Sequence, residues 1–186
     1  MLVCESTFAS DAHNANCKNI IEGIDARLQV DVIESSFQYG IQYAIDNGYA
    51  IVSRSTTGLE DSDQDEGQLM IDSGGIAVHA HGSNGYYEEL NLVTSVGAIV
   101  SVRDVDGSYG LGSEFTLTEY TYESYVTPYM AGKLAKYGLD YPSLTYTQIR
   151  QAIRDNASNG GEWQEITGYG TPDWDATEAL LSSYVT

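Results

Sequence analysis

A serine and a proline four residues apart open an apolar helix in the segment Glu123 to Gly132, ESYVTPYMAG. A serine in the first turn of a buried helix lies at the positive end of the helix dipole, where free backbone N–H groups can bind an oxyanion. Proline is tolerated in a first turn because its missing N–H would have no partner there, so we expect Pro128 in that turn. The segment therefore predicts a helix that presents Ser124 as a nucleophile.

Residues 144–153 downstream predict a loop, a threonine cap and a second helix. Thr145 has the side chain of a helix cap, and Ile149, Ala152 and Ile153 fall on one face of the helix that follows it. This pattern indicates an amphipathic helix packed against a core.

The serine segment resembles the serine motif of the subtilisin-like proteases, GTSMAxPHVAG, with Ser124 in the place of the nucleophile. Other segments resemble further parts of that family in the family's own order. They are residues 44–58 (a helix, glycine turn and strand), 76–85 (the next strand and its AAAGNxG end), 93–99 (VIAVGAV), 144–153 (the helix after the serine) and 168–180 (GYGxxDxxxAL). Alternating strands and helices are typical of an α/β protein. We expect a single subtilisin-like domain over residues 1–186, a three-layer α/β/α fold with a mostly parallel sheet.

The N-terminal part of the chain contains the other two groups of such a site. Residues 13–24 are similar to the family's HGTHCAGIIAGI, which implies that His13 is the general base. Just before it, an apolar run ends in Glu5, as the family's strand VAVIDSG ends in aspartate, which implies that Glu5 orients His13. The connection between them is much shorter than in the family. Each extended residue covers about 3.3 Å, however, so the two side chains can meet.

The resemblance also implies an oxyanion donor and a substrate site. We favour Asn84 over Ser83 as the donor, because a carboxamide reaches further and donates more strongly than a hydroxyl. A peptide substrate is expected to pair as an added strand along Ser55, Thr56, Thr57 and Gly58. Neutral imidazole can take the serine proton at neutral pH, and a carboxylate behind the ring fixes its tautomer. The set predicts a minimal serine endopeptidase with a Glu-His-Ser triad, and neither a metal nor a cofactor is expected.

Two residues favour a different function. Tyr122 and Glu123 stand where the family has Gly-Thr, which brings bulk and negative charge next to Ser124. The alternative is a catalytically inactive subtilisin-like domain that acts as a binding or structural module in a larger assembly, with its tyrosine-rich face against a protein partner. Taken alone, Ser124 is compatible with a helix cap and His13 with an exposed helix residue.

Three other features have a simpler structural interpretation. His79 and His81 alternate on one strand face, but without a third ligand we interpret them as half-buried strand residues rather than a metal pair. The acidic segment 59–68 lacks the ligand spacing of an EF-hand loop, so we expect a solvated loop. Cys4 and Cys17 fit two buried free thiols as well as a disulfide.

Charge excludes several classes of partner. The 186 residues include 8 basic and 27 acidic ones, a net charge of −19, which would repel the phosphates of nucleic acids and of anionic membranes. We therefore expect a peptide or protein substrate and no nucleic-acid or membrane partner. The sequence has no apolar run long enough for a membrane span, and its N-terminus lacks the basic region and cleavage site of a signal peptide. This pattern favours an intracellular or assembly-associated location.

Overall fold

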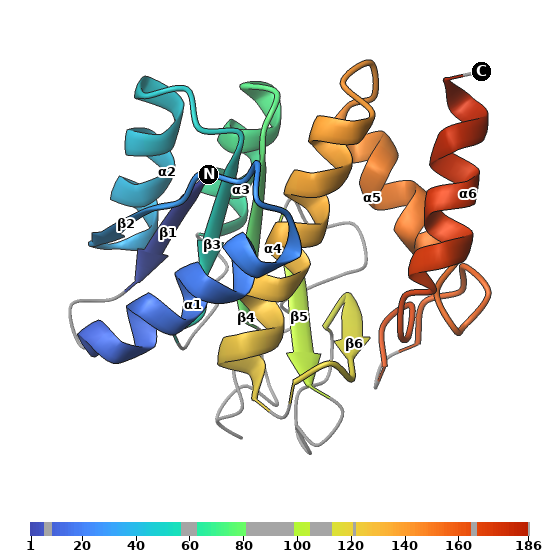
Figure 1. Cartoon of the computed structure of the whole chain (residues 1–186), viewed down its shortest axis with the longest axis horizontal. Coiled ribbons are helices and arrows are strands. Elements are labelled where there is room, and N and C mark those ends of the chain that lie inside the picture. The colour runs from blue at the N-terminus through green and yellow to red at the C-terminus, as the bar shows by residue number, and fades with distance from the viewer. Residues whose placement is uncertain are drawn as a thin grey trace.

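The computed structural model of the chain has a parallel β-sheet with helices on both faces (Figure 1). The structure describes residues 1–5, 9–56, 63–80, 99–104, 113–120, 122–164 and 167–185. Within them the strands are β1 (Leu2–Glu5), β2 (Asp31–Glu34), β3 (Ile51–Arg54), β4 (Ile76–Ala80), β5 (Val100–Asp104) and β6 (Phe115–Leu117). The helices are α1 (Asp11–Ile24), α2 (Phe37–Asp46), α3 (Asp63–Asp72), α4 (Glu123–Asp140), α5 (Tyr146–Asp155) and α6 (Trp174–Tyr184).

The order of the strands reverses at β1, between its neighbours β2 and β3. In the described residues every neighbouring pair is parallel, and the order is β2-β1-β3-β4-β5-β6. The chain thus leaves β1 on one side to form β2 and then crosses to the other side to form β3. Open α/β sheets bind ligands where the order reverses in this way, outside the carboxyl ends of the two strands. Here those strand ends are Glu5 and Arg54.

Alternation along the strands divides the core into two layers. Successive side chains of a strand point to opposite faces. Val3 packs in a core with residues of α1, α4, α5 and α6, whereas its neighbours Leu2 and Cys4 pack in a second core with residues of α2 and α3. The whole of β1 is buried, as expected for a strand covered on both faces. The predicted three-layer α/β/α architecture with a mostly parallel sheet is confirmed.

The prediction of a loop over residues 59–68 is wrong for its second half, because α3 begins at Asp63. Residues 59–62 lie outside the described residues. Carboxylates are favoured in the first turn of a helix by the positive end of its dipole, and Asp65 and Glu66 lie in that turn. Met70 anchors the helix, since its side chain is fully buried in the core beneath α2 and α3. The acidic residues therefore mark a helix start.

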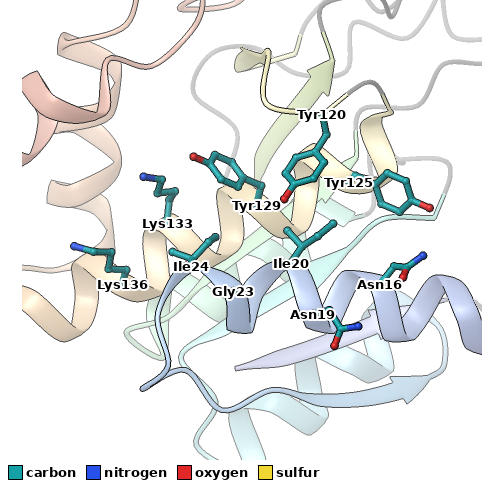
Figure 2. A pocket seen from close by; sticks show the side chains of 10 residues that line it. All are labelled: Asn16, Asn19, Ile20, Gly23, Ile24, Tyr120, Tyr125, Tyr129, Lys133 and Lys136. Carbon is teal, nitrogen blue, oxygen red and sulfur yellow. The ribbon is translucent and has the colours of Figure 1, made fainter.

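Helices α1 and α4 pack against each other on one face of the sheet (Figure 2). A pocket of 650 Å³ opens between them. Its lining includes Asn16 and Ile20 from α1 and Tyr125, Tyr129 and Lys133 from α4.

Within the part of the chain that the structure describes, no helix combines the length and apolar character that a membrane span needs.

Gly168→Ala is expected to lower the free energy of unfolding by about 3 kcal/mol. Gly168 has a φ of +60°, and a Cβ there would lie 2.2 Å from the backbone oxygens of Ser113 and Glu114. Backbone atoms next to a sheet cannot move aside as the end of a flexible side chain can. Urea unfolding measures the loss.

Gly48→Ala is the matched control. Gly48 also has a positive φ, +72°, but nothing lies within 4 Å of the position of its Cβ. We therefore expect Gly48→Ala to lower the free energy of unfolding by about 1 kcal/mol, the cost of holding alanine at a positive φ. Equal losses in the two variants would contradict the contact argument.

Candidate functional site

Glu5 lies at the carboxyl end of β1, where the strand order reverses, and its side chain is fully buried. Its two carboxylate oxygens accept hydrogen bonds from the backbone N–H groups of Ser55 (2.9 Å) and Thr56 (3.0 Å). These are the first two residues after β3. Hydrogen bonds from backbone N–H groups stabilise a carboxylate and fix its plane. The acid is therefore held in one orientation by the neighbouring strand.

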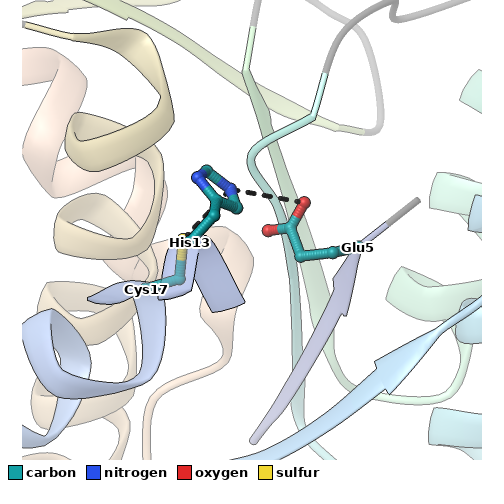
Figure 3. Close-up of side chains that lie close together, drawn as sticks. All are labelled: Glu5, His13 and Cys17. Atoms are coloured by element: carbon teal, nitrogen blue, oxygen red, sulfur yellow. Dashed lines mark hydrogen bonds and ion pairs between the residues drawn. The ribbon is translucent and has the colours of Figure 1, made fainter. Parts of the chain in front are cut away.

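His13 lies in the first turn of α1, beside Glu5 (Figure 3). Ser10 caps this helix by accepting a hydrogen bond from the His13 backbone N–H. Nε2 of its ring lies 3.9 Å from Oε2 of Glu5. The ring also stacks on Tyr125 of α4, with 6.3 Å between the ring centroids. The His13 side chain is 19% exposed and that of Glu5 0%. The imidazole therefore lies at the boundary between the core and solvent.

Cys17 completes this cluster, although its sequence position did not lead us to assign it to the site. It lies one turn after His13 on α1, and its sulfur is 3.5 Å from His13 Nε2 and 3.4 Å from the Ser55 hydroxyl (Figure 3). Burial raises the pKa of Cys17 to about 12, with the charge of Glu5 adding to the effect, so the thiol is protonated at neutral pH. The available signal was the spacing of His13 and Cys17, because residues four apart share one helix face.

Ser124 is the second residue of α4. The prediction that Pro128 lies in the first turn is wrong, because the helix begins at Glu123 and Pro128 falls inside it. Since proline has no N–H, the carbonyl oxygen four residues earlier, that of Ser124, lacks its helical hydrogen bond. The Cys17 thiol is a donor for this oxygen, at 3.7 Å. The thiol thus links α1 to α4 at the serine.

The N-terminus of α4 is open around Ser124. The residue at the cap position, Tyr122, makes no side-chain cap hydrogen bond and is 64% exposed. The Ser124 hydroxyl itself forms no hydrogen bond with the part of the chain that the structure describes. Cys17 contacts both the Ser124 backbone and the His13 ring, so the start of α4 adjoins the pair of Glu5 and His13.

Three predicted site residues, Asn84, Thr57 and Gly58, lie outside the described residues, and their roles stay predictions. Ser55 and Thr56 border the site, as their N–H groups bind Glu5. The predicted pairing of a substrate strand along this segment therefore has to use other backbone groups of these two residues.

The second histidine of the described residues, His79, lies in the core and contacts the backbone. His79 is fully buried, deeper than the half-buried position predicted for it, and its Nδ1 lies 2.6 Å from the Ala80 carbonyl oxygen. His81 lies outside the described residues. Cys4, like Cys17, is buried and free, so the cysteines form no bridge.

Glu5, His13 and Cys17 also have the side-chain types of a metal centre. One ligand atom from each lies within 4.8 Å of the others, and in the described part of the chain these three residues form such a group. Carboxylate oxygen, imidazole nitrogen and thiolate sulfur together are a donor set that suits zinc.

Solved structures similar to this chain include proteases. The protease domain of PatA, solved as a serine-to-alanine mutant, has a TM-score of 0.72 and 14% identity over 99% of this chain and 88% of that chain. The prenylagaramide maturation protease PagA has a TM-score of 0.67 and 12% identity, and the match covers 98% of this chain and 93% of that chain. Fervidolysin from Fervidobacterium pennivorans, a keratinolytic enzyme related to subtilisin, has a TM-score of 0.56 and 18% identity, and the match covers 75% of this chain and 28% of that chain.

No family model and no curated protein sequence matches the chain. Likeness at such low identity concerns the fold, and the strand order and layers described above agree with it. The resemblance that the sequence motifs indicated is thus confirmed at the level of the fold: this chain has the fold of the subtilisin-like proteases.

Proposed function

We propose that the chain is a small serine endopeptidase in which Ser124 attacks a peptide carbonyl, His13 takes its proton and Glu5 orients His13. The observation that carries the proposal is the buried Glu5 carboxylate beside the His13 ring, at the carboxyl edge of the sheet and next to the first turn of α4, which contains Ser124. Acid, imidazole and serine hydroxyl are the groups of a hydrolytic triad. The similar solved structures are proteases, which supports the same assignment.

The two nitrogens of His13 have different tasks in this mechanism. The nitrogen that faces Glu5 carries the proton, so the other nitrogen has the lone pair that accepts the proton of Ser124. Proton transfer converts the ring to imidazolium, which the nearby carboxylate stabilises. The distance of 3.9 Å to Glu5 is longer than a hydrogen bond. Catalytic hydrogen bonds are often long before substrate binds and shorten in the complex.

The start of α4 supplies stabilisation for the oxyanion. Backbone N–H groups of the first turn lack a side-chain cap, and the positive end of the helix dipole lies there. Asn84 is the second donor in this proposal. Each such donor contributes about 3 to 4 kcal/mol to the stabilisation of the transition state.

The pocket between α1 and α4 gives a substrate side chain a place to bind. Tyr125 lines the pocket and stacks on His13, so the pocket adjoins the reacting groups (Figure 2). Deeper along α4, the Lys133 ammonium lies 5.6 Å from the ring centroid of Tyr129 and 4.9 Å from that of Trp174. Burial, and then the charge of Lys136, lower the pKa of Lys133, and the charges of Glu119, Glu178 and Asp175 oppose this shift in part. An acidic substrate residue would add to these opposing charges, and we propose it as the side chain that this pocket favours.

The purified chain is expected to react covalently with a fluorophosphonate probe at Ser124, because such probes capture a serine that an imidazole activates. Ser124→Ala should abolish the labelling and the hydrolysis of a chromogenic peptide. Ser36→Ala is the control, since Ser36 also lies at the start of a helix, as the cap of α2, which packs in the other core layer from α1. Mass spectrometry of the labelled peptide identifies the site.

Labelling that persists in Ser124→Ala, or none in wild type shown to be folded by circular dichroism, contradicts the proposal. The double variant Tyr122→Gly, Glu123→Thr then separates the two functions, because it restores the family's residues before the serine. Activity gained by this variant would indicate an impaired peptidase. If the double variant gains no activity, the binding or structural module is favoured.

A further inference from the structure

The cluster of Glu5, His13 and Cys17 brings three different ligand atoms around one point (Figure 3). His13 Nε2 lies 3.9 Å from Glu5 Oε2 and 3.5 Å from Cys17 Sγ. In a tetrahedral zinc site with bonds of about 2.0 to 2.3 Å, neighbouring ligand atoms are about 3.3 to 3.7 Å apart. These two separations differ from the zinc values by a few tenths of an ångström, and the third, between a Glu5 carboxylate oxygen and Cys17 Sγ, is within 4.8 Å. Side-chain rotations would bring the three atoms to the tetrahedral spacing.

We propose that Glu5, His13 and Cys17 bind a zinc ion at a three-ligand tetrahedral site and that the bound ion inhibits the enzyme by occupying His13. The fourth position is open to water or to another ligand, as in three-residue zinc sites generally. The binding stands on the geometry of the cluster. Only the inhibition rests on the proposed peptidase function. Nε2 is the nitrogen that faces Glu5, so zinc on Nε2 leaves the ring proton on Nδ1, and Nδ1 then has no lone pair to accept the proton of Ser124.

Each of the three ligands is already held in place by its neighbours. The N–H groups of Ser55 and Thr56 fix the Glu5 carboxylate, which has about four lone-pair positions and so retains room for an ion. His13 is restrained by stacking on Tyr125, and Cys17 follows it by one turn of the same helix. Ligands held in this way by surrounding groups bind metal more tightly than free side chains.

The charges of the site balance when zinc binds. The incoming Zn²⁺ displaces the proton of the Cys17 thiol, which leaves to solvent, and a Zn–S bond forms with no change of oxidation state. Thiolate and carboxylate together carry two negative charges, so the cluster of ligands and ion is neutral. The partly exposed edge of His13 is the point of entry, and the net charge of −19 raises the local concentration of cations. A thiolate ligand selects zinc or cobalt over Mg²⁺ and Ca²⁺, which prefer oxygen ligands.

Cobalt is a spectroscopic probe for this site, because a cobalt–thiolate bond gives a charge-transfer absorption band. The chain with its cysteines reduced, titrated with Co²⁺, is expected to develop this band at one ion per chain and to lose it when Zn²⁺ is added. Cys17→Ala should abolish the band. Glu5→Gln should keep it but weaken Zn²⁺ binding by more than about 10- to 100-fold, the loss typical when only a group that supports a ligand is removed.

Cys4→Ala is the matched control, since Cys4 is the other buried free thiol and contacts Ser35 instead of His13. It should leave the band and the affinity unchanged. A band that survives in Cys17→Ala, a band lost in Cys4→Ala, or the absence of Zn²⁺ binding by folded wild type overturns the site. Circular dichroism confirms the fold of each variant, and Glu5→Gln tests the site independently of the cysteine.

The fluorophosphonate reaction separates the two proposals. Zinc at saturation should suppress labelling of Ser124, and a chelator should restore it. Zinc binding by a protein whose Ser124 is not labelled even in the absence of zinc supports the metal site and contradicts the peptidase. Labelling that continues in zinc-saturated protein overturns the inhibition.

Discussion

Glu5→Gln is expected to lower the turnover of a chromogenic peptide by about 10⁴-fold, the effect typical of removing the charge behind a catalytic histidine. The two Glu5 oxygens accept from the N–H groups of Ser55 and Thr56. Glutamine places an NH₂ group where one of these oxygens lies, so a donor faces a donor. The imidazolium also loses its carboxylate. Measured kcat should fall far more than KM changes, since His13 acts in the chemical step.

Glu34→Gln is the control for this result. Glu34 ends β2 in register with Glu5 and accepts a hydrogen bond from the Asn14 side chain, which a glutamine oxygen can also accept. We expect its turnover to match that of wild type. Stability must be measured alongside, because a buried unpaired N–H in Glu5→Gln costs about 1 to 3 kcal/mol. A turnover loss of equal size in both folded variants would remove Glu5 from the mechanism.

The fold was predictable because its main signals are local. Thr145 caps α5 as predicted, and Ile149, Ala152 and Ile153 are buried on one face of that helix. The acid at the end of the first strand was also visible in the sequence. The backbone N–H groups that bind Glu5 were not visible. The hydrogen bonds from Ser55 and Thr56 depend on the register of β1 against β3, which pairs Val3 with Ser53.

The misplaced turn of Pro128 has a local physical origin, the position of the helix start. Tyr122 is a poor cap residue, so no local signal marked the start of α4 at Glu123. Pro128 was consequently assigned to the wrong turn. The contact that this proline makes possible, between the Cys17 thiol and the Ser124 carbonyl oxygen, joins residues 107 positions apart and has no signature in either segment.

The salt-bridge network of Glu114 is another contact between distant residues, and it underlies the largest expected change in stability. Glu114 is 1% exposed and accepts hydrogen bonds from the guanidinium groups of Arg150 and Arg154, with both Nε atoms at 2.8 Å from Oε1. Asp140 is likewise paired with two cations, Arg27 and Lys136, but its side chain is 22% exposed. The two acids therefore differ in burial more than in the number of their partners.

Glu114→Gln is expected to lower the free energy of unfolding by about 3 to 5 kcal/mol, because it leaves buried cations without a counter-charge. Arg150 cannot turn to solvent freely, since it is 6% exposed and also donates to the Ile99 carbonyl oxygen. Asp140→Asn should cost about 1 kcal/mol or less, and added salt should shrink that loss because solvent screens exposed charges. Urea unfolding at low and high salt measures both. Equal losses would mean that the arginines reach water in the variant, and Glu114 would then not be what fastens α5 to the edge of the sheet.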